Sequence, residues 1–304
     1  MWGALIGDCI GSFWEFSGNK DTAIPLWVPA CRFTDDSVCT GAIAAWLTHR
    51  DGELPLQTVL HQRARGNLSS GFGDRMVAWA LNDNPQPYGS WGNGAAMRVS
   101  PVALFAQTES EALELAEQST APTHNHPESV RGAQATVLAI RHAFEHRNPS
   151  SLLAFIEERF GYAGLTQRRH EEERADHVFD VSCKGTVPLA LIIAAHAGSF
   201  DETMRQCCSM GGDADTLAAI AGSVAEALYG IPRQHLENAR RRFHPEDDIF
   251  EAVEAVYALP QAQNQLHHWG RSAGTIIAET DHRRVPRLGE KMSGLNSDRQ
   301  TQGQ

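Results

Sequence analysis

Apolar residues recur along most of the chain at intervals of three to four positions, and the alternation typical of strands is nearly absent. Because an α-helix turns once in about 3.6 residues, this spacing predicts amphipathic helices. Several of them begin with Ser, Thr or Asp, whose side chains accept hydrogen bonds from free helix N–H groups. The predicted helices cover 34–50, 95–107, 110–119, 127–146, 150–160, 186–197, 201–209, 215–229 and 247–259. The pattern indicates a single all-α domain over residues 1–260, with helices packed around a centre.

Three stretches lack this periodicity. Residues 82–93 are dense in Asn, Pro and Gly, and 161–175 end in a charged run, so both are predicted loops. Pro260 ends the last predicted helix, and the composition then turns polar. We therefore expect 261–304 to form a polar C-terminal tail that is poorly ordered or weakly docked.

Composition and charge exclude several classes of protein. Hydrophobic residues make up 42% of the 304 residues, as in ordinary globular proteins. The net charge of −11 repels polyphosphate, so general binding to nucleic acid or anionic membranes is not expected. The longest apolar run, 187–195, is about half of what a membrane span requires. Six cysteines without a Cys-x-x-Cys pair, together with an N-terminus unlike a secretion signal, indicate reduced thiols and a cytoplasmic protein.

Two acidic motifs stand immediately before apolar helices. The first is Thr34-Asp35-Asp36-Ser37, and the second is Gly211-Gly212-Asp213-Ala214-Asp215-Thr216. Asp and Thr are good helix caps, so the first motif alone is better explained by capping. Capping accounts for one Asp of the second motif but not for both together with the glycines. If the two motifs converge, four carboxylates and two hydroxyls form a ligand set for one or two hard divalent cations.

Glu15 is a further candidate for the same site. It lies in Gly11-Ser12-Phe13-Trp14-Glu15-Phe16, where an acidic side chain among aromatic residues needs a partner or a purpose. The alternative is that Glu15 occupies an exposed helix face. Asp8, in the same segment, is a weaker candidate.

Two more motifs have the composition of ligand-binding loops. Gly92-Asn93-Gly94 precedes a predicted helix, where backbone N–H groups can approach an anion, although such a loop is more often a tight turn. It matches neither a Walker loop nor a dinucleotide-binding loop. Thr123-His124-Asn125-His126-Pro127 lacks the further ligands of a zinc site, so polar contacts with a sugar or adenine suit it better. Capping of the helix from Pro127 is the alternative.

Taken together and in order, these segments resemble the ADP-ribosylglycohydrolase family over about residues 1–260. The family pattern Gly-x-x-x-Gly-Asp with a downstream Glu corresponds to Gly3–Asp8 and Glu15. Phe-Thr-Asp-Asp-Ser/Thr corresponds to 33–37, Gly-Asn-Gly-x-x-Met-Arg to 92–98, Thr-His-x-His-Pro to 123–127, and Gly-Gly-Asp-x-Asp-Thr to 211–216. Each motif alone is weak, whereas five in the right order are specific.

The resemblance implies a single compact orthogonal helical domain that binds two Mg²⁺ ions, with Mn²⁺ as an alternative. It implies that Glu15 lies beside the metals, and we expect Glu15 and Asp36 to act in catalysis. It implies that the ADP-ribose groove is lined by Asn93, Gly94 and Met97, with His124 or His126. The implied metal ligands are Thr34, Asp35, Asp36, Asp213, Asp215 and Thr216.

Two positions depart from the family pattern. Ser37 replaces the Thr of several relatives but keeps the hydroxyl. Relatives that act on ADP-ribosylated arginine often carry Asp-Ile-Gly between the second and third motifs, where this chain has Gly71-Phe72-Gly73-Asp74. The departure argues against an arginine-linked substrate more than against glycohydrolase chemistry.

The expected activity is metal-dependent hydrolysis at C1 of the distal ribose, which releases ADP-ribose from a modified protein side chain or a small conjugate. One alternative is an ADP-ribose-binding protein of weak activity on the same scaffold. Another is a metal-dependent hydrolase of other nucleotides or N-glycosides. We expect a monomer. Neither the acceptor nor the residue that acts as general base follows from the residues alone.

Overall fold

The computed structural model describes residues 1–49, 54–244 and 247–278. Its longer helices are α1 (Trp2–Gly11), α2 (Asp35–Thr48), α3 (Leu56–Gly66), α4 (Asp74–Leu81), α7 (Glu109–Thr120), α8 (Pro127–His146), α9 (Pro149–Phe160), α11 (Cys183–Ala197), α12 (Phe200–Met210), α13 (Ala214–Tyr229), α14 (Arg233–Arg240), α15 (Ile249–Ala258) and α16 (Pro260–His268). Shorter ones are α5 (Gly94–Met97), α6 (Ser100–Phe105), α10 (His170–Glu173) and α17 (Ala273–Ile276).

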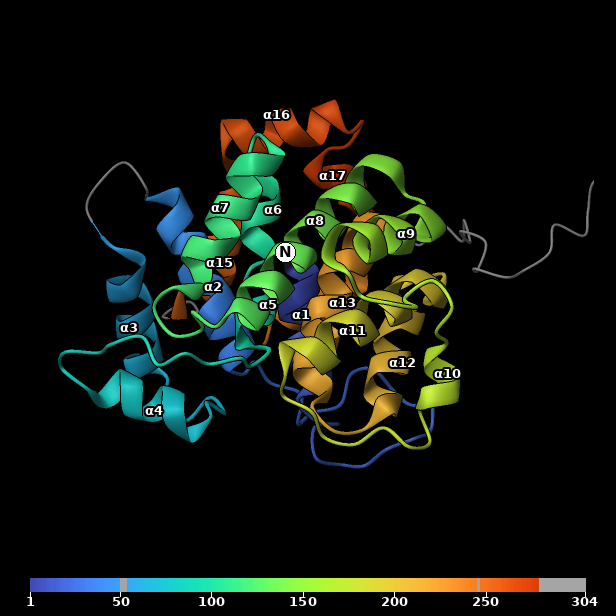
Figure 1. Cartoon of the computed structure of the whole chain (residues 1–304), viewed down its shortest axis with the longest axis horizontal. Coiled ribbons are helices and arrows are strands. Elements are labelled where there is room, and N and C mark those ends of the chain that lie inside the picture. Colours follow the sequence, from blue (N-terminus) through green and yellow to red (C-terminus); the bar gives the residue numbers. More distant parts are fainter. Residues whose placement is uncertain (50–53, 245–246, 279–304) are drawn as a thin grey trace, which may run out of the picture.

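The predicted all-α fold is confirmed. Among the described residues, the strands are β1 (Ile231–Pro232) and β2 (Ile277–Ala278), which pair in parallel. Figure 1 shows the helices gathered around α1 and α13, with α3 and α4 at one side and α9 and α10 at the other. Over the described part of the chain, no helix has both the length and the apolar character that a membrane crossing requires.

Helix α13 forms the centre of the core, and residues 214–228 of it are buried. Helix α1 packs directly against it along Gly3, Gly7 and Gly11, which recur every four residues and so share one face. A Cβ on Gly7 would lie 2.1 Å from the carbonyl oxygen of Ala218, so only glycine permits this approach. The close crossing brings the end of α1 to the beginning of α13.

The turn before α13 also depends on glycine. Gly211 and Gly212 have φ values of 72° and 78°, in the region that L-residues with a Cβ rarely adopt. These two residues reverse the chain between α12 and α13, so Asp213 and Asp215 stand at the start of the buried helix.

Three details of the predicted helices change. The helix expected at 95–107 is divided into α5 and α6, because Pro101 fits the first turn of a helix but not its interior. Glu15 lies in the turn after α1 rather than on a helix. The helices α1, α3, α4, α10 and α14 were not predicted, and α10 lies within the predicted loop 161–175. Of the eleven residues of α3, Leu56, Leu60 and Ala64 are buried.

The segment assigned to the tail contains helix α16 and strand β2. Leu266 is buried, and the ring of Trp269 stacks on Phe144 of α8 at a centroid distance of 5.5 Å. This part of the segment therefore docks on the helical domain. Residues 279–304 lie outside the described residues, and the predicted tail stays a prediction there.

Candidate functional site

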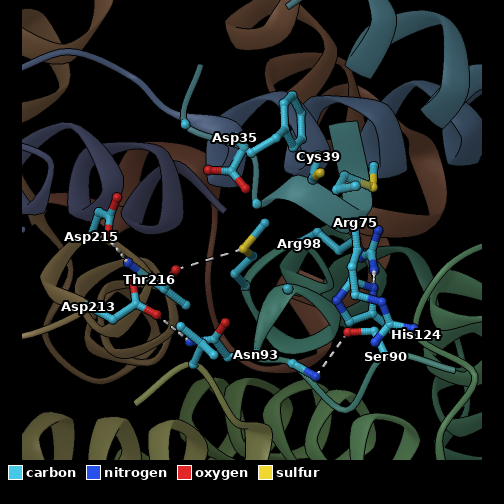
Figure 2. Close-up of a pocket in the computed structure, with 18 of the residues that line it drawn as sticks. Asp35, Cys39, Arg75, Ser90, Asn93, Arg98, His124, Asp213, Asp215 and Thr216 are labelled. Carbon is cyan, nitrogen blue, oxygen red and sulfur yellow. Dashed lines mark hydrogen bonds between the residues drawn. The ribbon is translucent and has the colours of Figure 1, made fainter. Parts of the chain in front are cut away.

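The beginnings of α2, α5 and α13 meet at a cavity of about 490 Å³. Figure 2 shows carboxylates on one side of it and cationic side chains with a histidine on the other. The acidic lining residues are Glu15, Asp35, Asp74, Asp213 and Asp215, and the basic ones are Arg75, Arg98 and His124. One cavity therefore offers a site for a cation next to a site for an anion.

Asp8 of α1 satisfies the free N–H groups at the beginning of α2. Its carboxylate accepts hydrogen bonds from the backbone nitrogens of Thr34 (2.8 Å) and Ser37 (3.0 Å), and from both hydroxyls, that of Thr34 at 2.6 Å. The side chain of Thr34, the N-cap residue, makes no capping bond itself. Because a residue of another helix caps α2, Asp35 and Asp36 are free for another role, which removes the capping explanation of this motif.

At the beginning of α13, Asp215 Oδ1 accepts from the backbone nitrogen of Thr216 at 2.9 Å, whereas Asp213 is not a cap. Asp213 occupies the N-cap position without a side-chain capping bond, and its Oδ2 instead accepts from Asn93 Nδ2 at 2.7 Å. Thr216 Oγ1 donates to Asp36 Oδ2 at 3.2 Å and so joins the two acidic motifs. Residues 180 positions apart in the sequence therefore belong to one cluster.

Ligand atoms of the acidic residues approach one another in two groups that share Asp215. Asp8, Asp36 and Asp215 form one group and Glu15, Asp213 and Asp215 the other, each with its atoms within 4.8 Å. Among the described residues, Asp36 Oδ1 is buried and has no hydrogen-bond partner. Crowded carboxylates with an unpaired buried oxygen fit a hard divalent cation, for which oxygen is the preferred ligand.

The electrostatics of the acidic cluster show the cost of holding it without a cation. Burial, and next the carboxylates of Asp8 and Asp213, raise the pKa of Asp35 to about 8. Burial and then Asp213 raise the pKa of Glu15 to about 7. Burial followed by neighbouring carboxylates also holds the pKa of Asp215 well above its usual range. Each shift means that negative charge is disfavoured here, so a cation stabilises the ionised cluster.

The other end of the cavity contains a fixed hydrogen-bond donor. Arg98 is buried, and its Nη2 donates to Thr123 Oγ1 at 2.9 Å and contacts His124 Nδ1 at 2.5 Å. Because a guanidinium only donates, His124 Nδ1 accepts and the proton is on Nε2. Burial and the charge of Arg98 lower the pKa of His124 well below its usual value, so the ring is neutral. Its Nε2–H group faces the glycine loop at Gly94.

The second glycine of this loop has no room for a side chain. A Cβ on Gly94 would lie 2.8 Å from His124 Nε2. We expect Gly94→Ala to displace His124 and lower the affinity for ADP-ribose about tenfold or more, the equivalent of one lost hydrogen bond of about 1.5 kcal/mol. Calorimetric titration measures the change, with Gly66→Ala as control because no atom lies within 4 Å of that position. Unchanged affinity in Gly94→Ala would contradict the assignment of the loop.

The structure separates the two candidate histidines. His124 lines the cavity, whereas His126 is the exposed N-cap of α8 and its Nδ1 accepts from the backbone nitrogen of Glu128 at 3.1 Å. We expect His126→Ala to cost about 1 kcal/mol of stability through the lost cap, with ADP-ribose binding unchanged. His124→Ala should instead weaken binding. Thermal unfolding and calorimetry of both variants test this, and weaker binding in His126→Ala alone would reverse the assignment.

The predicted ligands differ in their positions around the cavity. Glu15, Asp35, Asn93, Gly94, Met97, Asp213, Asp215 and Thr216 all line it. Asp36 lies behind this wall beside Thr216, and the Thr34 hydroxyl is directed to Asp8. A metal contact from Thr34 therefore stays a prediction.

Sequence reasoning missed several lining residues. Tyr88 lies in a loop without periodicity, and Phe179 and Val181 follow the charged run that ends the predicted loop 161–175. Arg98 belongs to the motif of residues 92–98, but nothing in the spacing of that motif indicated that the arginine side chain would be buried. Asp74 also lines the cavity, so the segment that departs from the family pattern still brings a carboxylate to the site.

Comparisons with known proteins identify the family of this chain. The family model for ADP-ribosylglycohydrolase matches residues 1–266. ADP-ribosylhydrolase ARH3 of Homo sapiens is 25% identical over a match that covers 75% of this chain and 84% of ARH3. ADP-ribosylarginine hydrolase Tri1 of Pseudomonas putida strain GB-1 is 24% identical, with 75% and 69% of the two chains covered.

A solved structure described as an ADP-ribosylglycohydrolase-related protein complex has the same fold. Its TM-score is 0.61 at 24% sequence identity, and the match covers 84% of this chain and 96% of the other. Since the family model spans the described helices from α1 to most of α16, and the motifs that match the family converge on one cavity, the chain belongs to the ADP-ribosylglycohydrolase family of enzymes.

Proposed function

We propose that this enzyme releases ADP-ribose from a conjugate by hydrolysing the bond at C1 of the distal ribose, and that the reaction depends on two Mg²⁺ ions, which Mn²⁺ can replace. The observation that carries the proposal is the acidic cluster built from two distant motifs, in which Asp36 Oδ1 is buried without a partner among the described residues. An ADP-ribosylated protein side chain is the proposed substrate, by analogy with the names of the relatives.

The cluster supplies the proposed ion ligands. Asp35, Asp36, Asp213, Asp215 and Thr216 would hold the cations, with Glu15 beside them. When bound, the ions would polarise the ribose hydroxyls and stabilise charge near the breaking bond. Asn93 Nδ2 orients Asp213, and Asp8 holds the beginning of α2, so both groups position proposed ion ligands. Asn93 also lines the cavity, and its predicted contact with ADP-ribose stays part of the proposal.

The opposite end of the cavity suits the pyrophosphate. Arg98 supplies positive charge, and the neutral His124 donates from Nε2 next to the glycine loop. Such buried donors attract an anion locally even though the chain carries a net charge of −11. The distal ribose would then extend from this end toward the carboxylates.

Hydrolysis also needs a group that moves a proton. Glu15 and Asp35 are the partly exposed carboxylates of the cluster, whereas Asp36, Asp213 and Asp215 are buried. We propose that Glu15 takes the proton from the attacking water as C1 gains positive character. For Asp36, which lies behind the cavity wall, the proposed part is to hold the ion.

Calorimetric titration with ADP-ribose tests the site, and release of ADP-ribose from arginine-linked and serine-linked peptides tests the reaction. We expect binding in Mg²⁺ and no binding in chelator, and release from at least one conjugate. Binding without release from any conjugate would favour the binding-protein alternative. An absence of binding in both conditions would contradict the proposal that the enzyme acts on an ADP-ribose conjugate.

A further inference from the structure

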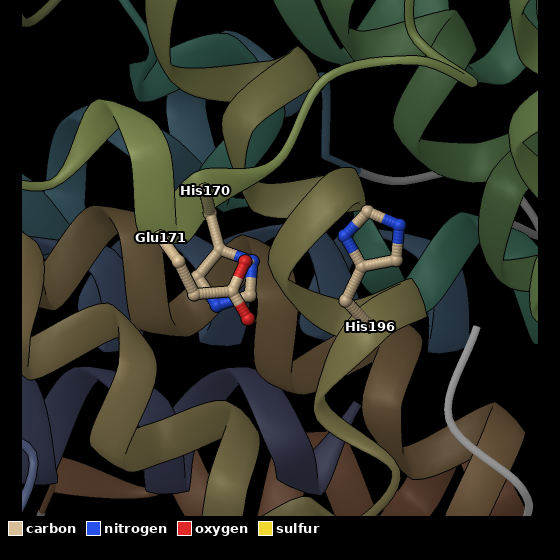
Figure 3. A group of neighbouring side chains, drawn as sticks. All are labelled: His170, Glu171 and His196. Carbon is tan, nitrogen blue, oxygen red and sulfur yellow. The ribbon is translucent and has the colours of Figure 1, made fainter. Parts of the chain in front are cut away.

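A second group of metal-binding side chains lies away from the cavity, between α10 and α11. Figure 3 shows His170 and Glu171 of the short helix α10 beside His196 of α11. One ligand atom of each lies within 4.8 Å of the others. The two histidines are 1% and 6% exposed, whereas Glu171 is exposed.

Hydrogen bonds fix which nitrogen of His170 is free. Its Nε2 lies 3.2 Å from Gln206 Oε1, and the amide nitrogen of Gln206 donates to Glu202, so the oxygen faces the ring. His170 Nε2 therefore donates, and Nδ1 keeps its lone pair. That nitrogen lies 3.3 Å from Glu171 Oε2, which places two acceptors face to face.

His196 presents two more unpaired atoms. Neither of its ring nitrogens, nor His170 Nδ1, has a hydrogen-bond partner among the described residues, and all three are buried. Burial, followed by the charge of Arg169, lowers the pKa of His196 to about 4, so the ring is neutral and available as a ligand. Arg169 and Arg174 oppose a cation here, whereas Glu171 and Glu202 favour one.

We propose that His170, His196 and Glu171 bind one Zn²⁺ ion, at a site separate from the acidic cluster. Two imidazoles and a carboxylate suit zinc, with water in the fourth position. Two atoms bound to zinc at about 2.1 Å are at most about 4.2 Å apart, whereas the ligand atoms here lie within 4.8 Å of one another. A rotation of the exposed Glu171 side chain and small rotations of the two rings would bring them to zinc-binding distance. Gln206 accepts from the other ring nitrogen of His170, the usual arrangement around a ligating histidine.

The ion would hold the segment that forms one wall of the substrate cavity against α11. The chain from α10 continues to Phe179 and Val181, which line that cavity, and α11 anchors the other side of the zinc site. Zinc is therefore expected to stabilise the folded protein without taking part in hydrolysis. This inference is independent of the proposed function.

Zinc content after gel filtration tests the proposal in the full-length protein, with excess Mg²⁺ present to occupy the acidic cluster. We expect about one Zn²⁺ per chain in wild type and in Asp215→Asn, and a thermal midpoint that rises with zinc. His196→Leu should lose the zinc, and Glu171→Gln, whose exposed side chain is not needed for folding, should bind it at least tenfold more weakly.

The matched control is His142→Leu, which removes a half-buried histidine that contacts His146 and Ser151 on the same molecule. It should keep the zinc. Any of three results would overturn the proposal. These are a wild type without zinc, zinc that persists in both His196→Leu and Glu171→Gln, and a loss of zinc from His142→Leu instead.

Discussion

Asp215→Asn is expected to lower the turnover of an ADP-ribosylated substrate about a hundred- to a thousandfold and to abolish binding of Mg²⁺ at the acidic cluster. Asp215 belongs to both groups of converging carboxylates, so its loss weakens every ion position that the cluster offers. Metal ions contribute several kcal/mol to catalysis, and each 1.4 kcal/mol corresponds to about a tenfold change in rate. Release of ADP-ribose at saturating Mg²⁺ measures the effect.

The control variant also replaces an aspartate by asparagine, but at an exposed position outside the acidic cluster. Asp83 is 91% exposed and pairs with Arg65 at 2.9 Å, far from any cluster ligand in the sequence. We expect Asp83→Asn to keep wild-type turnover and ion binding. If Asp215→Asn retained both, the acidic cluster would not be the metal site of this enzyme.

The long helices could be predicted because their apolar stripe is complete. Helix α8 begins and ends at the predicted residues, with Pro127 in its first turn. Helix α3 was not predicted because it has few apolar residues among its polar ones. Packing against α2 stabilises it. The alternative that Glu15 occupies a helix face is wrong, because α1 ends at Gly11 although the residues that follow keep an apolar character. Periodicity therefore finds long helices with one apolar stripe. It misses some helices that tertiary contacts sustain, such as α3, and some that are buried on every side, such as α1.

The motifs predicted which types of residue form the site, but not what each residue does there. Asp8 looked like a weak candidate ligand, yet it caps α2 through contacts with residues 26 and 29 positions away. His124 and His126 are equivalent in the pattern, and tertiary contacts distinguish them: His124 lies against the buried Arg98, whereas His126 caps α8. Such roles depend on which helix ends meet. The spacing of Gly3, Gly7 and Gly11 contains part of that information, because it marks the face of α1 that can approach α13.

Removal of the metal should lower the thermal midpoint of the wild-type protein by on the order of 5 to 10 °C. An ion present at about a hundred times its dissociation constant adds about 2.7 kcal/mol, and each kcal/mol shifts the midpoint of a chain of this size by roughly 2 to 4 °C. Without the ion, burial and then the repulsion among Glu15, Asp35, Asp213 and Asp215 disfavour the ionised cluster in the folded protein. Scanning calorimetry in Mg²⁺ and in chelator measures the difference.

The same experiment on Asp215→Asn distinguishes charge repulsion from general damage to the fold. The pKa of Asp215 is held well above its usual range, so its ionised form costs free energy in the folded state, and asparagine removes that cost. We therefore expect the chelated variant to melt above the chelated wild type, and Mg²⁺ to shift it little. A chelated variant that melts far below the chelated wild type would mean that Asp215 stabilises the metal-free fold, and the acidic cluster would then not be held under repulsion that a cation relieves.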